Sequence, residues 1–189
     1  MVDRIGKPGI FRQCFIMIVK GKNVFLRYPE ISDSDLMLTW ENDPEVWEAG
    51  ENKKPYSLQD IRDFILDGQD LYLRLQSRLM ICLNGDKRPI GCIDLFEYSE
   101  EHQRAGVGIL IYKKGDRRLG HATEALNLLI NFSRDHIKMH QLYCHILKDN
   151  QSSIGLFKKV GFETIGLKKA WRKSDQTFMD EYMFQLLLN

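Results

Sequence analysis

Cysteine, proline and long apolar runs are all scarce in this sequence. Its 189 residues include five prolines and four cysteines, and no two cysteines form a CxxC pair. This argues against a disulfide-stapled scaffold or a zinc ribbon. Cys82, Cys92 and Cys144 lie in apolar, strand-like runs, so we interpret them as buried thiols rather than disulfides, metal ligands or nucleophiles. The sequence predicts no metal site and favours a reducing cytoplasm.

An excess of charge of either sign is also missing. Lys and Arg number 27 and Asp and Glu number 26, for a net charge of +1. This balance gives no argument for a nucleic-acid or membrane partner. The apolar run at 11–19 is too short to span a bilayer and has no small-residue cleavage site, so we expect neither a membrane anchor nor a signal peptide. We interpret residues 1–21 as an N-terminal extension without an assigned function.

The remaining residues, 22–189, fit a single α/β domain. Apolar periodicity and turn signals predict the order βααβββαβαββ, which implies one mixed sheet with helices on both faces. We expect a polar loop over Glu97–Gln103 and helix starts near Ser32 or Asp33 and at Ser57. The predicted strands are 23–28, 79–83, 89–96, 104–112, 141–147, 162–167 and 178–188, and the later helices are 121–137 and 151–160.

The stretch from Lys113 to Leu126 organises this chain. It follows an aliphatic strand, contains four Lys and Arg residues and two glycines, Gly115 and Gly120, and leads into an amphipathic helix. Such a turn leaves backbone N–H groups unpaired at the positive end of a helix dipole, and glycine lets an anion approach closely. The stretch therefore predicts a phosphate or pyrophosphate site. A solvated basic turn without a ligand is the alternative at this point.

Two spaced motifs resemble those of the GNAT family of N-acetyltransferases. The first is Arg117-x-x-Gly120-x-Ala122, and the second is Asn150-x-x-Ser153 followed by the segment 156–162, LFKKVGF. They stand in the family's order and spacing, and the resemblance covers about residues 22–188. Within the family the chain is most similar to the branch of spermidine/diamine and ribosomal-protein N-terminal acetyltransferases.

This resemblance implies direct transfer of an acetyl group from acetyl-CoA to an amine. It implies that the basic turn holds the pyrophosphate, that strand backbone near Ile109–Ile111 binds the pantetheine arm and an oxyanion, and that Asn150 bonds the same arm. The implied cofactor-binding residues are Ile109, Leu110, Ile111, Arg117, Arg118, Leu119, Gly120, His121, Ala122, Thr123, Asn150, Ser153 and Phe157.

Two positions depart from the family pattern. Phe157 stands where the family usually has a Tyr that protonates the leaving thiolate, and Gly106 stands where several members have a Glu proposed as a base. Acid and base roles therefore cannot be carried over from the family. Local candidates are Asp94, Glu97, Tyr143, His145 and Glu181, among which we assign Tyr143 and Asp94 as catalytic. A solvated strand end for the carboxylates and a hydrogen-bonded histidine for His145 are the alternatives.

Charge near the N-terminus bears on the acceptor. Between Arg27 and Lys53 the chain has eight Asp and Glu residues and no Lys or Arg. With its aromatic residues this stretch predicts a wall for a cationic acceptor, and we assign Trp40, Glu48 and Glu97 to substrate binding. A solvated acidic helix surface is the alternative. The expected acceptor is a polyamine or other small amine, and a protein N-terminus is the alternative acceptor. The alternative function is a CoA-binding regulatory module. A homo-oligomer is possible.

Overall fold

The computed structural model describes residues 18–49, 54–67, 69–174 and 177–188. Within these ranges an eight-stranded sheet has the order β1-β2-β3-β4-β5-β6-β8-β7. The strands are β1 Ile18–Lys20, β2 Val24–Arg27, β3 Ser77–Leu83, β4 Pro89–Ser99, β5 Arg104–Ile111, β6 Gln141–Leu147, β7 Glu163–Ser174 and β8 Thr177–Leu187. The α-helices are α1 Ser34–Glu41, α2 Pro44–Ala49, α3 Leu58–Leu66, α4 Leu71–Arg74, α5 His121–Phe132 and α6 Gln151–Lys159.

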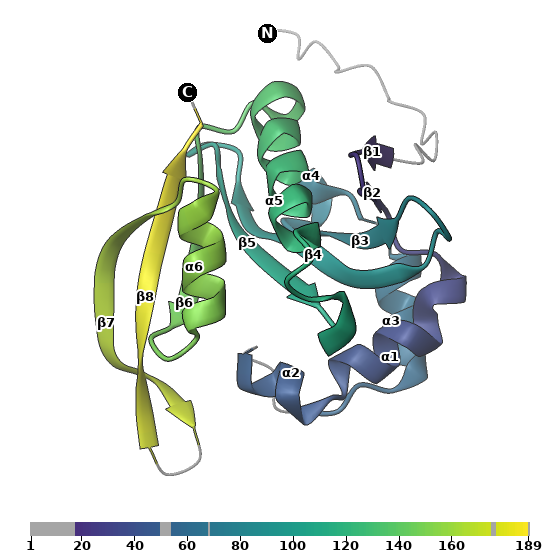
Figure 1. The fold of residues 1–189 in the computed structure, drawn as a ribbon, viewed down its shortest axis with the longest axis horizontal. Helices are drawn as coiled ribbons and strands as arrows, with labels where there is room; N and C mark the ends of the chain where they lie inside the picture. The colour runs from purple at the N-terminus through teal and green to yellow at the C-terminus, as the bar shows by residue number, and fades with distance from the viewer. Residues whose placement is uncertain (1–17, 50–53, 68, 175–176, 189) are drawn as a thin grey trace, which may run out of the picture.

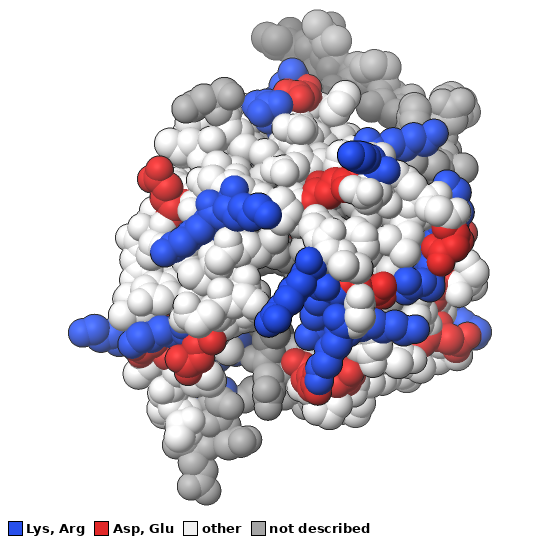
Figure 2. Space-filling model, in the orientation of Figure 1, with Lys and Arg blue, Asp and Glu red and all other residues white. Residues whose placement is uncertain are grey.

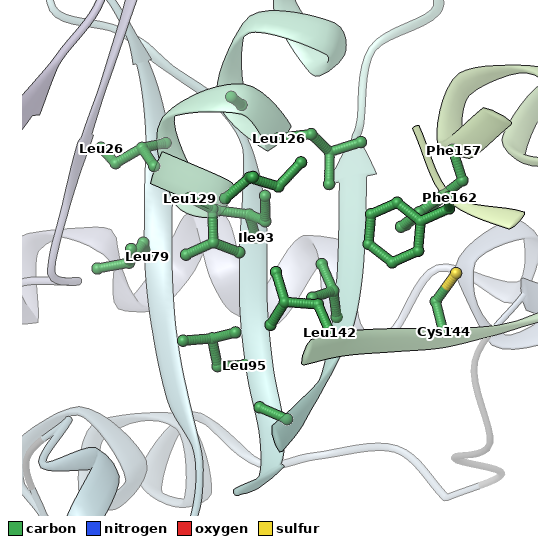
Figure 3. Packing of buried hydrophobic residues seen from close by; sticks show 14 of the residues in the cluster. Leu26, Leu79, Ile93, Leu95, Leu126, Leu129, Leu142, Cys144, Phe157 and Phe162 are labelled. Carbon is green, nitrogen blue, oxygen red and sulfur yellow. The ribbon is translucent and has the colours of Figure 1, made fainter. Parts of the chain in front are cut away.

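Helices pack on both faces of the sheet, as the sequence predicts (Figure 1). On one face α5 and α6 cover a large core that includes Leu126 and Leu129 of α5 and Phe157 of α6. Figure 3 shows these side chains against the strands, with Phe157 and Phe162 lying together. On the other face α1 and α3 cover a smaller core. The mixed α/β fold is therefore confirmed.

Local sequence signals explain several helix ends. Ser57 caps α3: its Oγ accepts from the Asp60 N–H, and the Asp60 carboxylate accepts from the Ser57 N–H at 2.7 Å. Pro44, predicted only to interrupt a helix, begins α2, where its missing N–H costs nothing. Helix α5 passes into a π-helical turn at Ser133–Ile137, so the predicted end at 137 is correct.

Some element predictions were incomplete. The strand β1, inside the predicted N-terminal extension, pairs antiparallel with β2. The short helix α4, capped by Asp70, was not predicted. The predicted loop over Glu97–Gln103 is partly strand, since β4 continues to Ser99 through a bulge after Phe96. Tyr98 within the bulge is buried, which helps to explain why the strand continues.

The sheet opens between β5 and β6. These two strands are parallel and pair only at Arg104, Ala105 and Gly106 of β5. The last pair joins Gly106 to Tyr143. Beyond it β5 continues to Ile111 and β6 to Leu147, and the two strands no longer pair with each other. Strands β1–β5 therefore form one half of the sheet and β6–β8 the other, and Figure 1 shows α2 below the lower end of the gap between them.

Candidate active site

The opening exposes one edge of β5. The Tyr112 N–H bonds to the Ile90 carbonyl on the β4 side, and backbone groups alternate in direction along a strand. Even-numbered residues therefore bond to β4 and odd-numbered ones face the opening. Consistent with this, the Ile111 carbonyl accepts from Arg117 Nε at 2.8 Å. Ile109 lies beyond the end of the ladder with β6, so its N–H and C=O point into the opening.

A turn rich in free N–H groups closes one end of the opening. Gly120 begins α5 in the left-handed conformation, with φ of 87°, and Arg118 shares it with φ of 62°. Among the described residues, the first backbone hydrogen bond of this helix runs from the Glu124 N–H to the Gly120 carbonyl. The preceding N–H groups are therefore available to an anion at the positive end of the α5 dipole.

Ion pairs and carbonyl bonds hold this turn in place. Arg117 donates to the carbonyls of Ile111 and Tyr112, each at 2.8 Å. Arg88 donates two hydrogen bonds, of 2.8 and 3.0 Å, to the Asp116 carboxylate, and these bonds lower the Asp116 pKa below its usual value. The Arg117 side chain thus positions the turn through protein carbonyls, whereas the sequence assigned it to the pyrophosphate. Arg88 was not predicted at all, because nothing in its local sequence marks a partner 28 residues away.

Asn150 occupies the first position before α6. Its Oδ1 accepts from the Ser153 N–H at 3.1 Å and from the Ser152 hydroxyl at 2.9 Å. This acceptor caps the helix. The structure gives the Asn150 Nδ2 group no acceptor within the ranges it describes, and Asn150 lines the cavity beside β5. The donor half of the amide is therefore available for a ligand while the acceptor half is used locally.

These parts surround one cavity of about 810 Å³. Figure 2 shows Lys and Arg side chains around a hollow at the centre of this face. Most residues that the sequence assigned to the cofactor line the cavity: Ile109, Leu110, Ile111, Arg117, Arg118, Gly120, His121, Ala122, Thr123, Asn150 and Ser153. Asp43, Glu45 and Val46 line it from the other side, and Lys114 pairs with Glu45 at 3.1 Å.

Leu119 and Phe157 are not among the residues that line this cavity. Leu119 is exposed on the turn. Phe157 is buried in the core and meets Phe162 edge to face, with ring centroids 5.0 Å apart. On α6 the cavity takes Ser152, Gly155, Leu156 and Lys159, and Phe157 falls on the sheet-facing side of the helix. In this structure its ring is a core side chain and does not reach the cavity.

Tyr143 and Glu97 meet on the sheet face opposite α5 and α6. The Tyr143 hydroxyl donates to the Glu97 carboxylate. Burial, with a further contribution from Glu97, raises the Tyr143 pKa well above its usual value, so the phenol keeps its proton at neutral pH. Glu97 adopts φ of 49° in the β4 bulge. Tyr143 also contacts the His145 ring at a centroid distance of 5.5 Å, as the alternation along a strand predicts.

Asp94 is bound to Arg78 on the same sheet face. Arg78 donates to both Asp94 oxygens, at 2.7 and 3.0 Å, and pairs with Glu41 as well. This bidentate pairing makes Asp94 a fixed negative charge, which does not favour the predicted role as a proton acceptor. Arg78 links β3, β4 and α1, and no local sequence signal predicted this role.

The predicted acceptor wall is only partly where the sequence placed it. Trp40 is buried, 2% exposed, and packs with Tyr112 in the smaller core, so it cannot contact an acceptor. An aromatic residue on the inner side of an amphipathic helix belongs to the core before it belongs to a site. Asp33 is buried and pairs with Arg27, and the partly buried Glu41 pairs with Arg78, so part of the acidic stretch is neutralised. The side chain of Glu48 lies outside the part of the chain that the structure describes.

The described residues contain no cluster of three or more His, Cys, Asp or Glu side chains placed to hold a metal ion. They also include no helix long and apolar enough to cross a membrane.

A sheet that opens beside a helix N-terminus rich in free N–H groups defines a class of transferases that use a CoA thioester. A family model described as acetyltransferase (GNAT) domain matches residues 23–163. This chain belongs to the GNAT family and is an N-acetyltransferase.

Relatives and solved structures agree with this membership. The chain is 29% identical over 166 residues to an uncharacterised N-acetyltransferase p20 of Bacillus licheniformis, covering 86% of this chain and 91% of the relative. It is 27% identical to spermidine N(1)-acetyltransferase of Escherichia coli K12 over 100 residues, 53% of each chain. A spermidine N-acetyltransferase of Vibrio cholerae, solved with CoA and spermine, superposes with a TM-score of 0.79 at 19% identity, covering 88% of this chain and 96% of that one.

Proposed function

We propose that this N-acetyltransferase transfers the acetyl group of acetyl-CoA to the primary amine of a small cationic acceptor of the polyamine class. The observation that carries the proposal is the opening between β5 and β6, which joins a basic, N–H-rich cavity to a sheet face bearing Glu97, Tyr143 and His145. The relatives named for spermidine support the acceptor class.

The residues around the cavity fit acetyl-CoA by their chemistry. The turn at Arg118–Thr123 offers N–H groups and cationic side chains to a pyrophosphate. The open edge of β5 and the Asn150 Nδ2 group offer partners to the amides of a pantetheine arm. When bound, acetyl-CoA supplies an activated acetyl thioester. The Ile109 N–H, directed into the opening, would stabilise negative charge that develops on the carbonyl oxygen.

An acceptor amine must lose a proton before it can attack. At neutral pH this costs an alkylamine about 4–5 kcal/mol. Glu97 is exposed at the bulge and held by the Tyr143 hydroxyl, so it can attract an ammonium and receive its proton directly or through water. Tyr143 keeps its own proton and orients Glu97. Asp94 contributes fixed negative charge from its pair with Arg78.

Acidic residues on the other side of the cavity support a cationic acceptor. Asp43 and Glu45 line it from the corner between α1 and α2. A side-chain hydrogen bond between Tyr112 and Asp43 raises the Tyr112 pKa. The same bond connects this corner to the end of β5. A polyamine carries further ammonium groups that such carboxylates would bind at a distance from the reacting amine.

The test is thiol release from acetyl-CoA with a panel of acceptors. Spermidine and putrescine should be turned over faster than peptides with free N-termini, and Glu97→Gln should lower kcat/KM for the amines by about 10²-fold or more, the scale of general base catalysis. Faster turnover of peptides would favour the protein N-terminal alternative, for which a Danio rerio N-alpha-acetyltransferase 50, 31% identical over 77 residues, is a relative. Tight acetyl-CoA binding without turnover of any acceptor would favour a regulatory module.

A further inference from the structure

Three residues on the acceptor face, Lys168, Trp171 and Glu181, have no role in the function proposed above, and they cluster with His145. Lys168 of β7 lies with its Nζ 3.1 Å from His145 Nδ1, 3.5 Å from Glu181 Oε2 and 4.7 Å from the centre of the Trp171 ring. A carboxylate, an imidazole nitrogen and an aromatic face are groups that recognise an ammonium ion. His145, Glu181 and Trp171 therefore form a cation cage, with Lys168 as its occupant.

The cage lies beside the opening of the sheet. Gly106 and Tyr143 form the last pair between β5 and β6, and His145 lies two residues further along β6 on the same face as Tyr143. Gly108 likewise lies two residues beyond this last pair, on β5. His145 therefore borders the opening on its acceptor side, and the cage extends from it toward β7.

The cage is built by a distortion of β7. Between Lys168, paired with Glu181, and Arg172, paired with Met179, β7 has two more residues than β8. Ala170 takes φ of 47° within this bulge, and its N–H bonds to Asp180 at 3.0 Å. In a regular strand, residues three apart point to opposite faces. The bulge brings the Trp171 ring to the same side as the Lys168 ammonium.

Burial separates this cluster from an ordinary surface ion pair. Glu181 is 4% exposed, so its carboxylate needs a cation. Trp171, in contrast, is 63% exposed and forms an open wall. The cage thus has a buried anionic floor and access from solvent, which a binding subsite needs and a cross-strand pair does not.

We infer that Lys168 is a specificity-determining residue that fills a cation subsite of the acceptor face. Because the subsite already holds an ammonium, an acceptor cannot place a second ammonium there, and its further charges must lie toward Asp43 and Glu45. This rests on the proposed function. Removing the Lys168 charge would open the subsite and favour acceptors with more ammonium groups over monoamines.

The first test does not depend on turnover. Lys168→Ala should unfold at lower temperature than wild type because the buried Glu181 loses its lysine partner and keeps, among the residues that the structure describes, only His145, whose Nδ1 lies 3.9 Å from Glu181 Oε2. Millimolar propylammonium chloride should restore the melting temperature in a saturable manner. The rescue should vanish in Lys168→Ala/Glu181→Gln. Lys148→Ala is the matched control and should show no rescue. It removes a more exposed lysine, directly after β6, that pairs with Asp180 of β8. A propylammonium effect no larger than in this control would overturn the cation subsite.

The second test measures specificity. In Lys168→Met, which keeps most of the side-chain volume and is assayed at a temperature below the onset of its unfolding, the ratio of KM for butylamine to KM for spermidine should rise about tenfold or more. Lys168→Arg should keep the wild-type ratio because it keeps the charge. An unchanged ratio in Lys168→Met would overturn the specificity role. Failure of wild type to acetylate any amine would instead count against the proposed function, while the thermal test would still decide on the subsite.

Discussion

The Phe96 ring lies directly over Gly106, at the last pair before β5 and β6 separate. A Cβ atom at position 106 would lie 2.3 Å from Phe96 Cε2. Real Cβ contacts do not approach so closely, so any side chain at this position must displace the ring. Some family members have a glutamate here, and the packing of Phe96 in this chain leaves no room for one. A glutamate introduced at position 106 would therefore first disturb the packing, and its effect on catalysis could not be separated from that.

Gly106→Ala should destabilise the fold by about 1–3 kcal/mol, the usual cost of overpacking. Gly108→Ala on the same face of β5 is the control, because its nearest neighbour, again in Phe96, would be 3.8 Å away. Urea unfolding of both variants measures the difference. If Gly106→Ala is equally costly in a Phe96→Ala background, the ring is not the cause.

Gly120→Asp should largely abolish acetyl-CoA binding. Position 120 has open space around it, so the fold can accept the side chain apart from the cost of its φ of 87°. The new carboxylate would stand among the N–H groups proposed for the pyrophosphate. Isothermal titration calorimetry with acetyl-CoA measures the effect, and Gly85→Asp, also in open space but in the β3–β4 turn, controls for added charge. Equal affinity of the two variants would contradict the assignment.

Asn150→Asp and Asn150→Ala separate two roles of one side chain. The aspartate keeps an oxygen for the Ser153 N–H and should leave stability close to wild type, whereas the alanine should lose about 1 kcal/mol with the cap. Both lose the Nδ2 donor and should lose roughly 1–2 kcal/mol of acetyl-CoA affinity, the scale of one hydrogen bond. Calorimetry and thermal unfolding give the two readouts. Wild-type affinity in the aspartate variant would reduce Asn150 to a helix cap.

Tyr143→Phe should change how stability depends on pH above 10. The folded state raises the Tyr143 pKa, through burial first and then the Glu97 carboxylate, so the folded state holds this proton more tightly than the unfolded chain. The resulting stabilisation is complete below the unfolded value near 10 and is lost as pH rises from there toward the folded value. Urea unfolding at several pH values from 8 upward should show a constant gap between wild type and variant that shrinks above pH 10. A gap that stays constant there would contradict the raised pKa.

Much of the fold follows from local sequence signals. Ser57 and Asp60 form a capping box, Gly120 provides a left-handed helix start, and the strands around Asn84-Gly85 follow the apolar pattern, since each depends on neighbours within a few residues. Most cavity residues on β5 and the turn were also predicted, with Asn150 and Ser153 at the start of α6, because short motifs place them. The other cavity residues on α6 were not predicted, and the predicted Phe157 lies in the core.

Features that depend on distant partners were not predictable. Arg78 gathers Asp94 and Glu41 from 16 and 37 residues away, and the β7 bulge exists only in relation to β8. Trp40 was misplaced for a related reason: the sequence shows that it is aromatic and near acidic residues, but only the packed sheet shows which side of α1 it occupies. Charge in a sequence window likewise does not show which carboxylates are already paired.

The one-sided pairing of β5 gives this strand two kinds of amide proton. Toward β4 the N–H groups of Gly108, Leu110 and Tyr112 belong to a continuous ladder and should exchange with deuterium as slowly as those of any central strand. Toward the opening the N–H of Ile109 has no strand beside it and should exchange like that of an edge strand. Protection along this part of β5 should therefore alternate residue by residue. A bound pantetheine arm that accepts a hydrogen bond from the Ile109 N–H should slow the exchange of this amide, as a neighbouring strand would.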